Sequence, residues 1–369
     1  MNAFASQSDR ILSEAEIRRR LARHAVPDSW RGYAAFAVDI AGWMSGVAGV
    51  LALHPMPLKI LASLLAGAFM VNLGALAHEA AHGSMVESRL GNKLIAWACF
   101  TVILFNYRLW VFEHHHIHHA ETNEFGHNSW SPLSKAEYAA LPRYRRALER
   151  LYRSDTGLGF APYYVFSRWL GAHVFPRAWV PERFVASSWR YTASLAAYAG
   201  AMLAVLACAP LYSATSALTA VLLGFAVPFL VWITTFSFSV CLQHTHPAVP
   251  WYRDPERGTK YPVEELTVHA RFPRWFGVLT HFAMDHPVHH VNARIPFYRL
   301  HEAQRELAEL TGTTDNAVDV SVPAIRGILR ACKLYDFERR CWTDFDGNAT
   351  GPVHAPLRRN AEQSWQTQG

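Results

Sequence analysis

Four long apolar runs limit the architectures open to this chain of 369 residues. They cover residues 32–53, 60–77, 191–209 and 217–240. Each is close to the roughly 20 residues that a helix needs to cross a bilayer. Residues 54–59, which include two prolines, separate the first two runs, and a short stretch around Pro210 separates the last two. The pattern predicts an all-α, polytopic membrane protein whose four transmembrane helices form two hairpins.

The composition agrees with a membrane location and argues against several other classes. Hydrophobic residues make up 51% of the chain and charged residues only 17%, whereas soluble domains carry about a quarter charged residues. The net charge of +6 does not come from Lys and Arg interleaved with aromatic residues, so we expect a lipid bilayer and no nucleic acid as a partner. The five cysteines are scattered without a CxxC pair, which disfavours a disulfide framework or an iron–sulfur site.

The distribution of positive charge predicts the orientation. Residues 108–190 contain eleven Arg and Lys side chains, whereas the connections 54–59 and 210–216 contain only Lys59. The positive-inside rule therefore places the arginine-rich segment in the cytoplasm. We expect one membrane domain over residues 1–369, with hairpins at 32–77 and 191–240 and cytoplasmic segments at 1–30, 78–190 and 241–369. Both termini would then be cytoplasmic, and the protein would lie in a bacterial inner membrane.

Shorter segments complete the predicted architecture. Residues 94–105 are apolar but too few to cross a bilayer, which indicates a re-entrant or interfacial helix. Residues 300–310 and 322–337 have the apolar spacing of helices and are expected to cap the cytoplasmic face.

Asp39 interrupts the first apolar run. An ionisable side chain within a span marks a functional site by default, but this one could equally reach the membrane surface by snorkelling. The sequence leaves both interpretations open.

Three histidine clusters follow or lie near the apolar runs. Box 1 is His78-Glu-Ala-Ala-His82, box 2 is His115-His-Ile-His118-His119, and box 3 is His286-Pro-Val-His289-His290. On helices, residues spaced i, i+3 and i+4 share one face. Neutral imidazole is the commonest metal ligand, and eight imidazoles are too many for one ion, so the boxes predict a site for two metal ions.

Other residues near the boxes are candidates for the same site. His244, which directly follows the last apolar run, is a plausible ninth ligand, and His246 ranks below it. The carboxylates of Glu79, Glu113, Asp285 and Glu121 are candidates for holding the N–H groups of the ligating rings.

Two other functions fit part of this pattern. Box 1 also matches the HExxH motif, in which the Glu is the general base of a zinc protease. An intramembrane metalloprotease would, however, need a further ligand that the last two runs lack, and it would leave six box histidines unused. A metal transporter would place its ligands at the middle of the bilayer, whereas these boxes lie at its edge.

The boxes and several flanking motifs resemble those of the membrane fatty-acid desaturases, most closely the acyl-lipid omega-6 (delta-12-type) enzymes. The resemblance covers roughly residues 30–345. Besides the boxes, it rests on Leu-Gln-His-Thr-His-Pro at 242–247, Thr-Val-His-Ala-Arg-Phe-Pro-Arg-Trp at 267–275, and Ile-Pro-Phe-Tyr-Arg-Leu at 295–300. In box 1 the chain departs from the many relatives that carry Asp-Cys-Gly between the histidines, and His127 stands where an aspartate is expected.

The resemblance implies an O2-dependent oxidoreductase that introduces a cis double bond into a fatty acyl lipid. It implies a di-iron site, and electrons from a separate donor of the ferredoxin or cytochrome-b5-like kind. The iron ligands that it implies are His78, His82, His115, His118, His119, His244, His286, His289 and His290. Hydroxylases, acetylenases and ketolases share the same scaffold and are the alternative activities.

Overall fold

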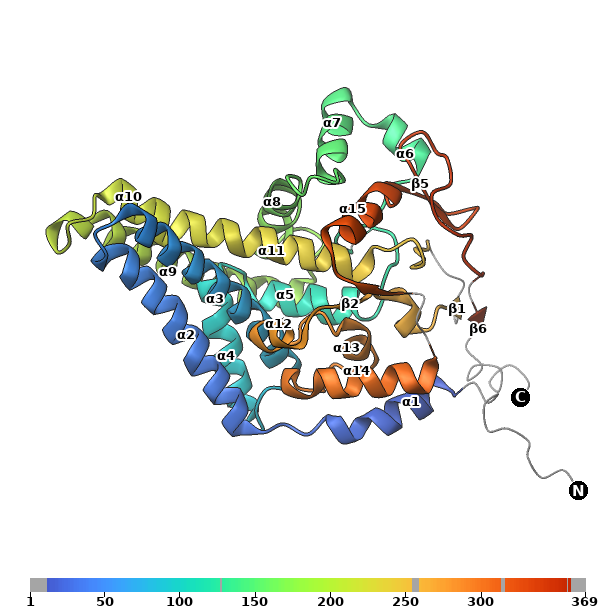
Figure 1. Cartoon of the computed structure of the whole chain (residues 1–369), viewed down its shortest axis with the longest axis horizontal. Helices are drawn as coiled ribbons and strands as arrows, with labels where there is room; N and C mark the ends of the chain where they lie inside the picture. The colour runs from blue at the N-terminus through green and yellow to red at the C-terminus, as the bar shows by residue number, and fades with distance from the viewer. Residues whose placement is uncertain (1–11, 127, 254–258, 313–315, 357, 360–369) are drawn as a thin grey trace, which may run out of the picture.

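The computed structural model of the protein describes residues 12–126, 128–253, 259–312, 316–356 and 358–359. His127 and the first eleven residues of the predicted N-terminal segment lie outside the described residues. The described chain is mostly helical. Long helices extend to one side of the molecule, and shorter helices gather at their other end (Figure 1).

The long helices correspond to the predicted apolar runs. They are α2 (Ser29–Ala52), α3 (Met56–His82), α9 (Glu182–Ala207) and a continuous helix made of α10 (Ala217–Val221), η6 (Leu222–Ala226) and α11 (Val227–His244). By length and composition, three described helices can cross a membrane: α2, α3 and the continuous helix Ala217–His244. The first, second and fourth predicted spans are therefore confirmed as apolar helices of sufficient length.

The predicted third span differs. Helix α9 forms but is not among the candidate spans, because its first third carries Arg183 and Arg190 and its apolar part begins only afterwards. A fourth candidate is the pair formed by α4 (Arg89–Val102) and the helix Tyr107–His118. Together they pass the same test of length and composition, but they are bent by 106° where they meet. A bend of this size agrees with the re-entrant helix predicted around residues 94–105. The arrangement of four spans in two hairpins stays a prediction.

Small residues let the long helices approach one another closely. A Cβ atom on Gly46 of α2 would lie 2.8 Å from Ala62 O of α3, and one on Gly74 of α3 would lie 2.1 Å from the ring of Trp232 in α11. Trp232 is almost fully buried. Close backbone contact at small residues is a typical means of packing helices within a membrane. The Gly74–Trp232 contact fixes α3, which carries box 1, against α11, which ends at His244.

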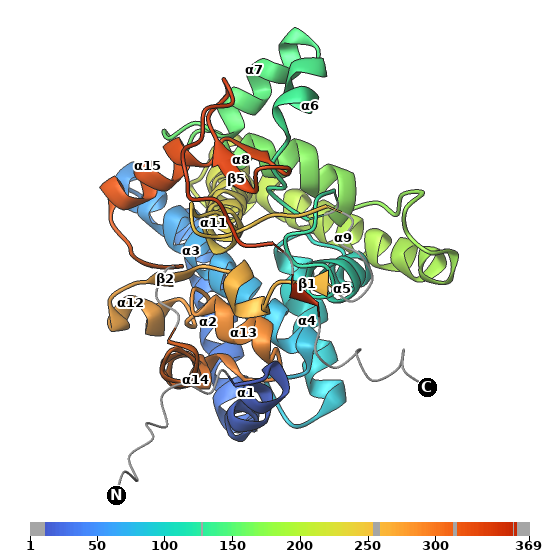
Figure 2. The ribbon, with the colours of Figure 1, turned by 90° about the vertical axis from the view of Figure 1, so that its right-hand side faces the viewer.

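Most of the remaining helices form a cap at the end of α3 and α11 (Figures 1 and 2). The exception is η5 (Ala209–Leu211), which follows α9 at the far end of the long helices. The cap contains α1 (Glu14–Leu21), η2 (Ala22–His24), α5 (Tyr107–Glu113), η3 (His114–His118), α6 (Lys135–Ala140), α7 (Arg143–Tyr152), α8 (Phe160–Tyr163), η4 (Tyr164–His173), η7 (Val263–Leu266), α12 (Arg274–Leu279), α13 (His286–Val291), α14 (Phe297–Thr311) and α15 (Val322–Ala331). The main core lies where Leu73 and Leu76 of α3 meet α4, α13 and α14. Within the cap, Oε2 of Glu306 in α14 lies 2.7 Å from Nε2 of His24 in η2.

Three small sheets show that the expectation of an all-α chain was too simple. β1 (Thr259–Lys260) pairs antiparallel with β6 (Arg358–Arg359), β2 (His269–Arg271) parallel with β3 (Ala317–Asp319), and β4 (Leu334–Asp336) antiparallel with β5 (Cys341–Thr343). The helix predicted over residues 300–310 is part of α14. The helix predicted over 322–337 ends early, because residues 334–336 pair as strand β4.

The Gly74–Trp232 contact makes a stability prediction. The methyl group of Gly74→Ala would collide with the buried indole, and overpacking of this kind costs about 1–3 kcal/mol. We expect a lower midpoint of thermal unfolding for the detergent-solubilised protein. Gly200→Ala in α9 is the control, since nothing lies within 4 Å of its added Cβ. Equal midpoints for the two variants would contradict this account of the α3–α11 contact.

Candidate metal centre

Box 1 occupies the last turns of α3. His78 and His82 lie one turn apart, and the helix ends at His82 because Gly83 takes a left-handed conformation with φ of 73°. Glycine at this position ends a helix without the strain that a Cβ would add. The two imidazoles therefore stand in the last two turns of α3.

Box 2 is not the α-helix that its spacing predicts. Residues His114–His118 form the π-helical segment η3, and His119 N donates to His114 O at 3.0 Å across five residues. A π turn places residues i and i+5 on one face, and such turns often mark functional sites. The ring of His114, stacked on Trp110 with centroids 4.1 Å apart, therefore joins the rings of His118 and His119.

Box 3 lies on the short helix α13, in which His286, His289 and His290 are all buried. Asp285 precedes the helix and Pro287 stands in its first turn, where proline fits because no intrahelical N–H bond is lost. His244 is the last residue of α11 and is also buried. Its Nε2 lies 3.0 Å from Nε2 of His286, so the end of α11 and box 3 meet.

The structure brings these rings into two groups. The first contains His78, His82, His114, His119 and His289, and the second contains His118, His244, His286 and His290; within each group one ligand atom of every residue lies within 4.8 Å of the others. In the first group, His114 Nε2 is 3.0 Å from Nε2 of both His82 and His119. In the second, His290 Nε2 is 3.0 Å from His286 Nε2 and 3.1 Å from His118 Nε2.

Eight of the nine predicted ligands belong to these groups, and His115 does not. Its ring lies 4.5 Å from that of His82, and its buried Nε2 has no hydrogen-bond partner among the described residues. His114, which was not among the predicted ligands, stands in the first group. The α-helical period selects residue 115 as the partner of His118 and His119, and His115 stays a prediction.

The electrostatics of the groups suit metal binding. Burial, and then the neighbouring imidazoles, hold the pKa of His119, His286, His289 and His290 well below the ordinary value. These rings are therefore neutral near pH 7 and present lone pairs, the form that binds metals. Several lone pairs converging at about 3 Å repel one another unless a cation lies between them, so the donor set fits one ion in each group.

Side chains around the groups orient the rings. Glu79 accepts from His78 Nδ1 at 3.1 Å and from Ser84 Oγ at 3.1 Å. Asn128 Oδ1 lies 3.1 Å from His118 Nδ1, and Asn123 Oδ1 lies 3.0 Å from His244 Nδ1. A hydrogen bond at Nδ1 directs Nε2 towards the centre and sets the tautomer. The two asparagines were not predicted, although Asn123 stands just after box 2.

The other predicted carboxylates have different partners. Asp285 accepts from His269 at 2.9 Å and His301 at 3.1 Å. Glu113 is paired with Arg168 and lies 3.3 Å from His173. The contribution of Glu121 is its backbone carbonyl, which accepts from Asn128 at 2.6 Å.

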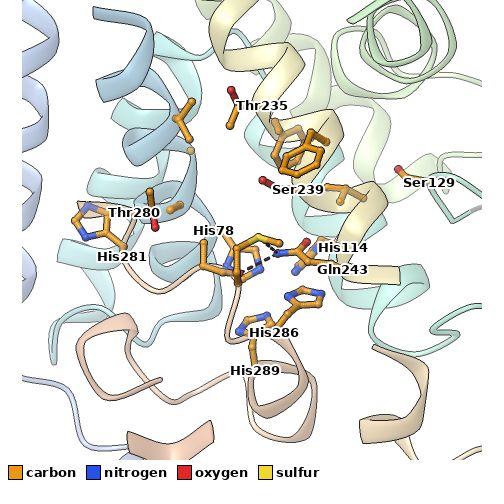
Figure 3. A pocket seen from close by; sticks show the side chains of 18 of the residues that line it. His78, His114, Ser129, Thr235, Ser239, Gln243, Thr280, His281, His286 and His289 are labelled. Carbon is orange, nitrogen blue, oxygen red and sulfur yellow. Dashed lines mark hydrogen bonds between the residues drawn. The ribbon is translucent and has the colours of Figure 1, made fainter. Parts of the chain in front are cut away.

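An apolar cavity opens onto both groups. Its volume is about 220 Å³, and its walls come from α3, α11, η3, η4 and the segment before box 3. Val71, Trp232 and Phe236 supply apolar wall surface. Figure 3 shows His78, His114, His286 and His289 gathered on one side of this cavity, with Thr235 on the opposite side. A long apolar molecule in the cavity would thus lie against the imidazole rings.

Comparisons with known proteins place the chain in a family. The sequence profile described as "Fatty acid desaturase" matches residues 54–319. The chain is 26% identical to the chloroplastic omega-6 fatty acid desaturase of Glycine max, over 82% of this chain and 70% of that protein. It is 25% identical to the sn-1 oleoyl-lipid 12-desaturase of a Picosynechococcus species, over 79% of this chain and 81% of that protein.

A second cyanobacterial relative, the sn-1 oleoyl-lipid 12-desaturase of a Synechocystis species, is 28% identical over 74% of both chains. These matches confirm the resemblance that the histidine boxes suggested. They run through the same helices that carry the two histidine groups. The chain therefore belongs to the fatty acid desaturase family and is an oxidoreductase.

Proposed function

We propose that the protein desaturates the acyl chains of membrane lipids, using O2 and introducing a cis double bond. One observation carries the proposal: two groups of converging imidazoles lie against an apolar cavity. An alkyl C–H bond has no acidic proton, so acid–base groups alone cannot break it. The relatives named omega-6 and oleoyl-lipid 12-desaturases support a lipid acyl substrate.

We propose that each histidine group holds one iron ion. When bound, the two ions would supply the redox chemistry with O2 that removes two hydrogen atoms from unactivated carbons. His115, which the family resemblance implies, stays a predicted ligand, while the geometry favours His114 in its place. Two electrons per turnover have to come from a separate donor of the ferredoxin or cytochrome-b5-like kind.

The residues of the chain position the substrate and shape its environment. The rings of Trp232 and Phe236 and the small surface at Gly74 line an apolar channel, which would hold one segment of an acyl chain and exclude water. Holding the reacting carbons in place converts binding energy into a lower barrier. Glu79, Asn123 and Asn128 keep the N–H groups of three rings engaged and their lone pairs aimed inwards.

The orientation in the membrane follows from the same proposal. The two groups lie at the end of α3 and α11, and box 2 lies within the arginine-rich segment 108–190, which also contains α7. The positive-inside rule then puts both termini and the metal centre on the cytoplasmic face. Exposed Arg143, Arg145 and Arg150 of α7 would favour an acidic electron donor.

The reaction itself can be tested by lipid analysis. In bacteria that express the chain, mass spectrometry should detect acyl chains that have lost two hydrogen atoms, and His289→Ala should abolish this product. A gain of one oxygen would instead assign hydroxylation, one of the alternative activities on this scaffold. Unchanged lipids in the presence of a competent electron donor would contradict the proposal.

The register of box 2 makes a second prediction. Because His114 and not His115 joins the first group, His114→Ala should weaken iron binding by at least the roughly 10–100-fold that loss of a supporting contact costs. His115→Ala should retain most of the iron. The measurement is the iron content of both purified variants after dialysis against a chelator. If His115→Ala lost more iron than His114→Ala, the assignment of His114 to the first group would be wrong, and the ligand would be His115, as the α-helical spacing predicts.

Glu79 separates desaturation from the HExxH protease alternative. Here it accepts a hydrogen bond from His78, and glutamine can do the same. Glu79→Gln should keep measurable desaturase activity, whereas Glu79→Ala should lower metal affinity roughly 10–100-fold. A protease would lose all activity in both variants, since its general base would be gone.

A further inference from the structure

A buried carboxylate in α2 pairs with a histidine that precedes box 3. Asp39 is only 2% exposed, so the snorkelling interpretation is wrong. Its Oδ2 lies 2.6 Å from His281 Nε2, and its Oδ1 accepts from Asn72 Nδ2 of α3 at 3.3 Å. The pair joins the first apolar hairpin to the loop between α12 and α13. Ionisable side chains at this position in a membrane protein are costly and usually functional.

His281 belongs to the wall of the acyl cavity. In Figure 3, His281 and Thr280 lie at one side of the view and Ser129 lies at the other. Between the two sides lie the labelled histidines of the two groups, His78, His114, His286 and His289. The φ of His281 is 54° and that of Phe282 is 52°, a conformation that residues with a Cβ rarely adopt. Backbone strain of this kind gathers at functional sites. Its ring is thus held at one end of the cavity.

The charge of the pair determines which hydrogen bond it offers. In apolar surroundings a pair without net charge is strongly favoured over a lone carboxylate. A neutral pair is either an ionised Asp39 with a doubly protonated His281, or a protonated Asp39 that donates to Nε2. Both forms carry a proton on Nδ1, the ring nitrogen that Asp39 does not engage. A neutral pair of either form therefore keeps one N–H donor on His281, a residue that lines the cavity.

The depth of the pair matches that of lipid ester groups. Asn72 lies sixteen residues after Met56, the first residue of α3, which corresponds to about 24 Å along a helix. The hydrocarbon layer is about 30 Å thick, so the pair lies near its cytoplasmic boundary. His78 is one and a half turns further along α3. Next to the pair, Trp275, Val278 and Leu279 of α12 are more than half exposed, as expected for a helix that faces lipid.

We propose that the Asp39–His281 pair is the polar end of the acyl cavity and donates a hydrogen bond from Nδ1 of His281 to the acyl carbonyl. The proposal rests on the proposed function. The carbonyl would be the ester of a membrane lipid, with the chain extending from it past the histidine groups. Because one end of the chain is fixed, the distance from this donor to the metal centre selects the carbons that react. Asp39 and His281 are then residues that determine the position of the double bond.

Binding can be tested without any turnover. Methyl oleate, oleic acid and 8-heptadecene, a hydrocarbon without a carbonyl, are titrated into the purified protein in detergent. Wild type should bind methyl oleate roughly 5–10-fold more tightly than the hydrocarbon, the value of about one hydrogen bond. A preference for the ester over the acid assigns a lipid ester, and the reverse assigns a free carboxylate; both keep a carbonyl site. Equal affinity of wild type for the ester and the hydrocarbon would overturn it.

Two variants test the residues. Asp39→Asn removes the carboxylate that stabilises a proton on Nδ1 of His281, so the preference for the ester should weaken while the iron content stays unchanged. His281→Phe keeps a ring but has no N–H group, so the preference should vanish. His54→Phe, at an exposed position in the loop before α3, is the control and should retain the preference. If both Asp39→Asn and His281→Phe keep it, the assignment of this pair is wrong.

The products give a second, independent measurement. Wild type should place the double bond at one position, whereas Asp39→Asn should give a mixture of positional isomers and a higher KM with a smaller change in kcat. A purely structural role would lower the iron content or the unfolding midpoint and leave the position unchanged, which would overturn the proposal. If wild type makes no unsaturated product, the proposed function fails, but the binding measurement still decides whether a carbonyl site exists.

Discussion

The candidate metal centre depends on the convergence of nine imidazoles at one end of a helix bundle. These rings come from four separate elements: the end of α3, the π turn of box 2, the last residue of α11 and the short helix α13. Each ring must lose its contact with water and face its neighbours' lone pairs. The helix packing has to supply the rigidity for this, and the close contact of Gly74 with Trp232 supplies part of it where α3 and α11 approach the site. Hydrogen bonds that Glu79, Asn123 and Asn128 accept from three rings complete the orientation of those rings.

The sequence predicted those parts of the fold that follow from hydrophobic length and local spacing. Three of the four apolar runs are helices of sufficient length, and eight of nine predicted ligands fall into the two groups. Both results depend on the residue pattern within a short stretch of sequence, and contacts with the rest of the fold rarely change the structure that such a pattern predicts. The third run was harder to judge, because Arg190 stands directly before its apolar stretch and makes the helix α9 less hydrophobic as a whole.

The parts that the sequence could not predict depend on contacts between distant segments. The π turn that selects His114 is a change of helical register, and residue spacing alone assumes one register. The hydrogen bond between Asn123 and His244 requires that the segment after box 2 lie beside the end of α11. Strand β4 replaced the end of a predicted helix because β5 lies next to it. Asp39 was noticed as unusual, but its partner His281 is more than two hundred residues away and has no local signal.

Trp232 has two roles that bear on how the substrate range of such an enzyme can diverge. The same indole packs on the backbone of Gly74 and forms a wall of the cavity. Any substitution of Trp232 that reshapes the cavity also weakens the packing of α3 against α11, so evolution towards longer or bulkier acyl substrates is constrained on that side. Another part of the cavity wall is formed by Phe272 and Phe276, which lie in the segment around the short helix α12 and outside the long helices. New chain-length preferences should therefore accumulate in this loop while the interior of the bundle remains almost unchanged.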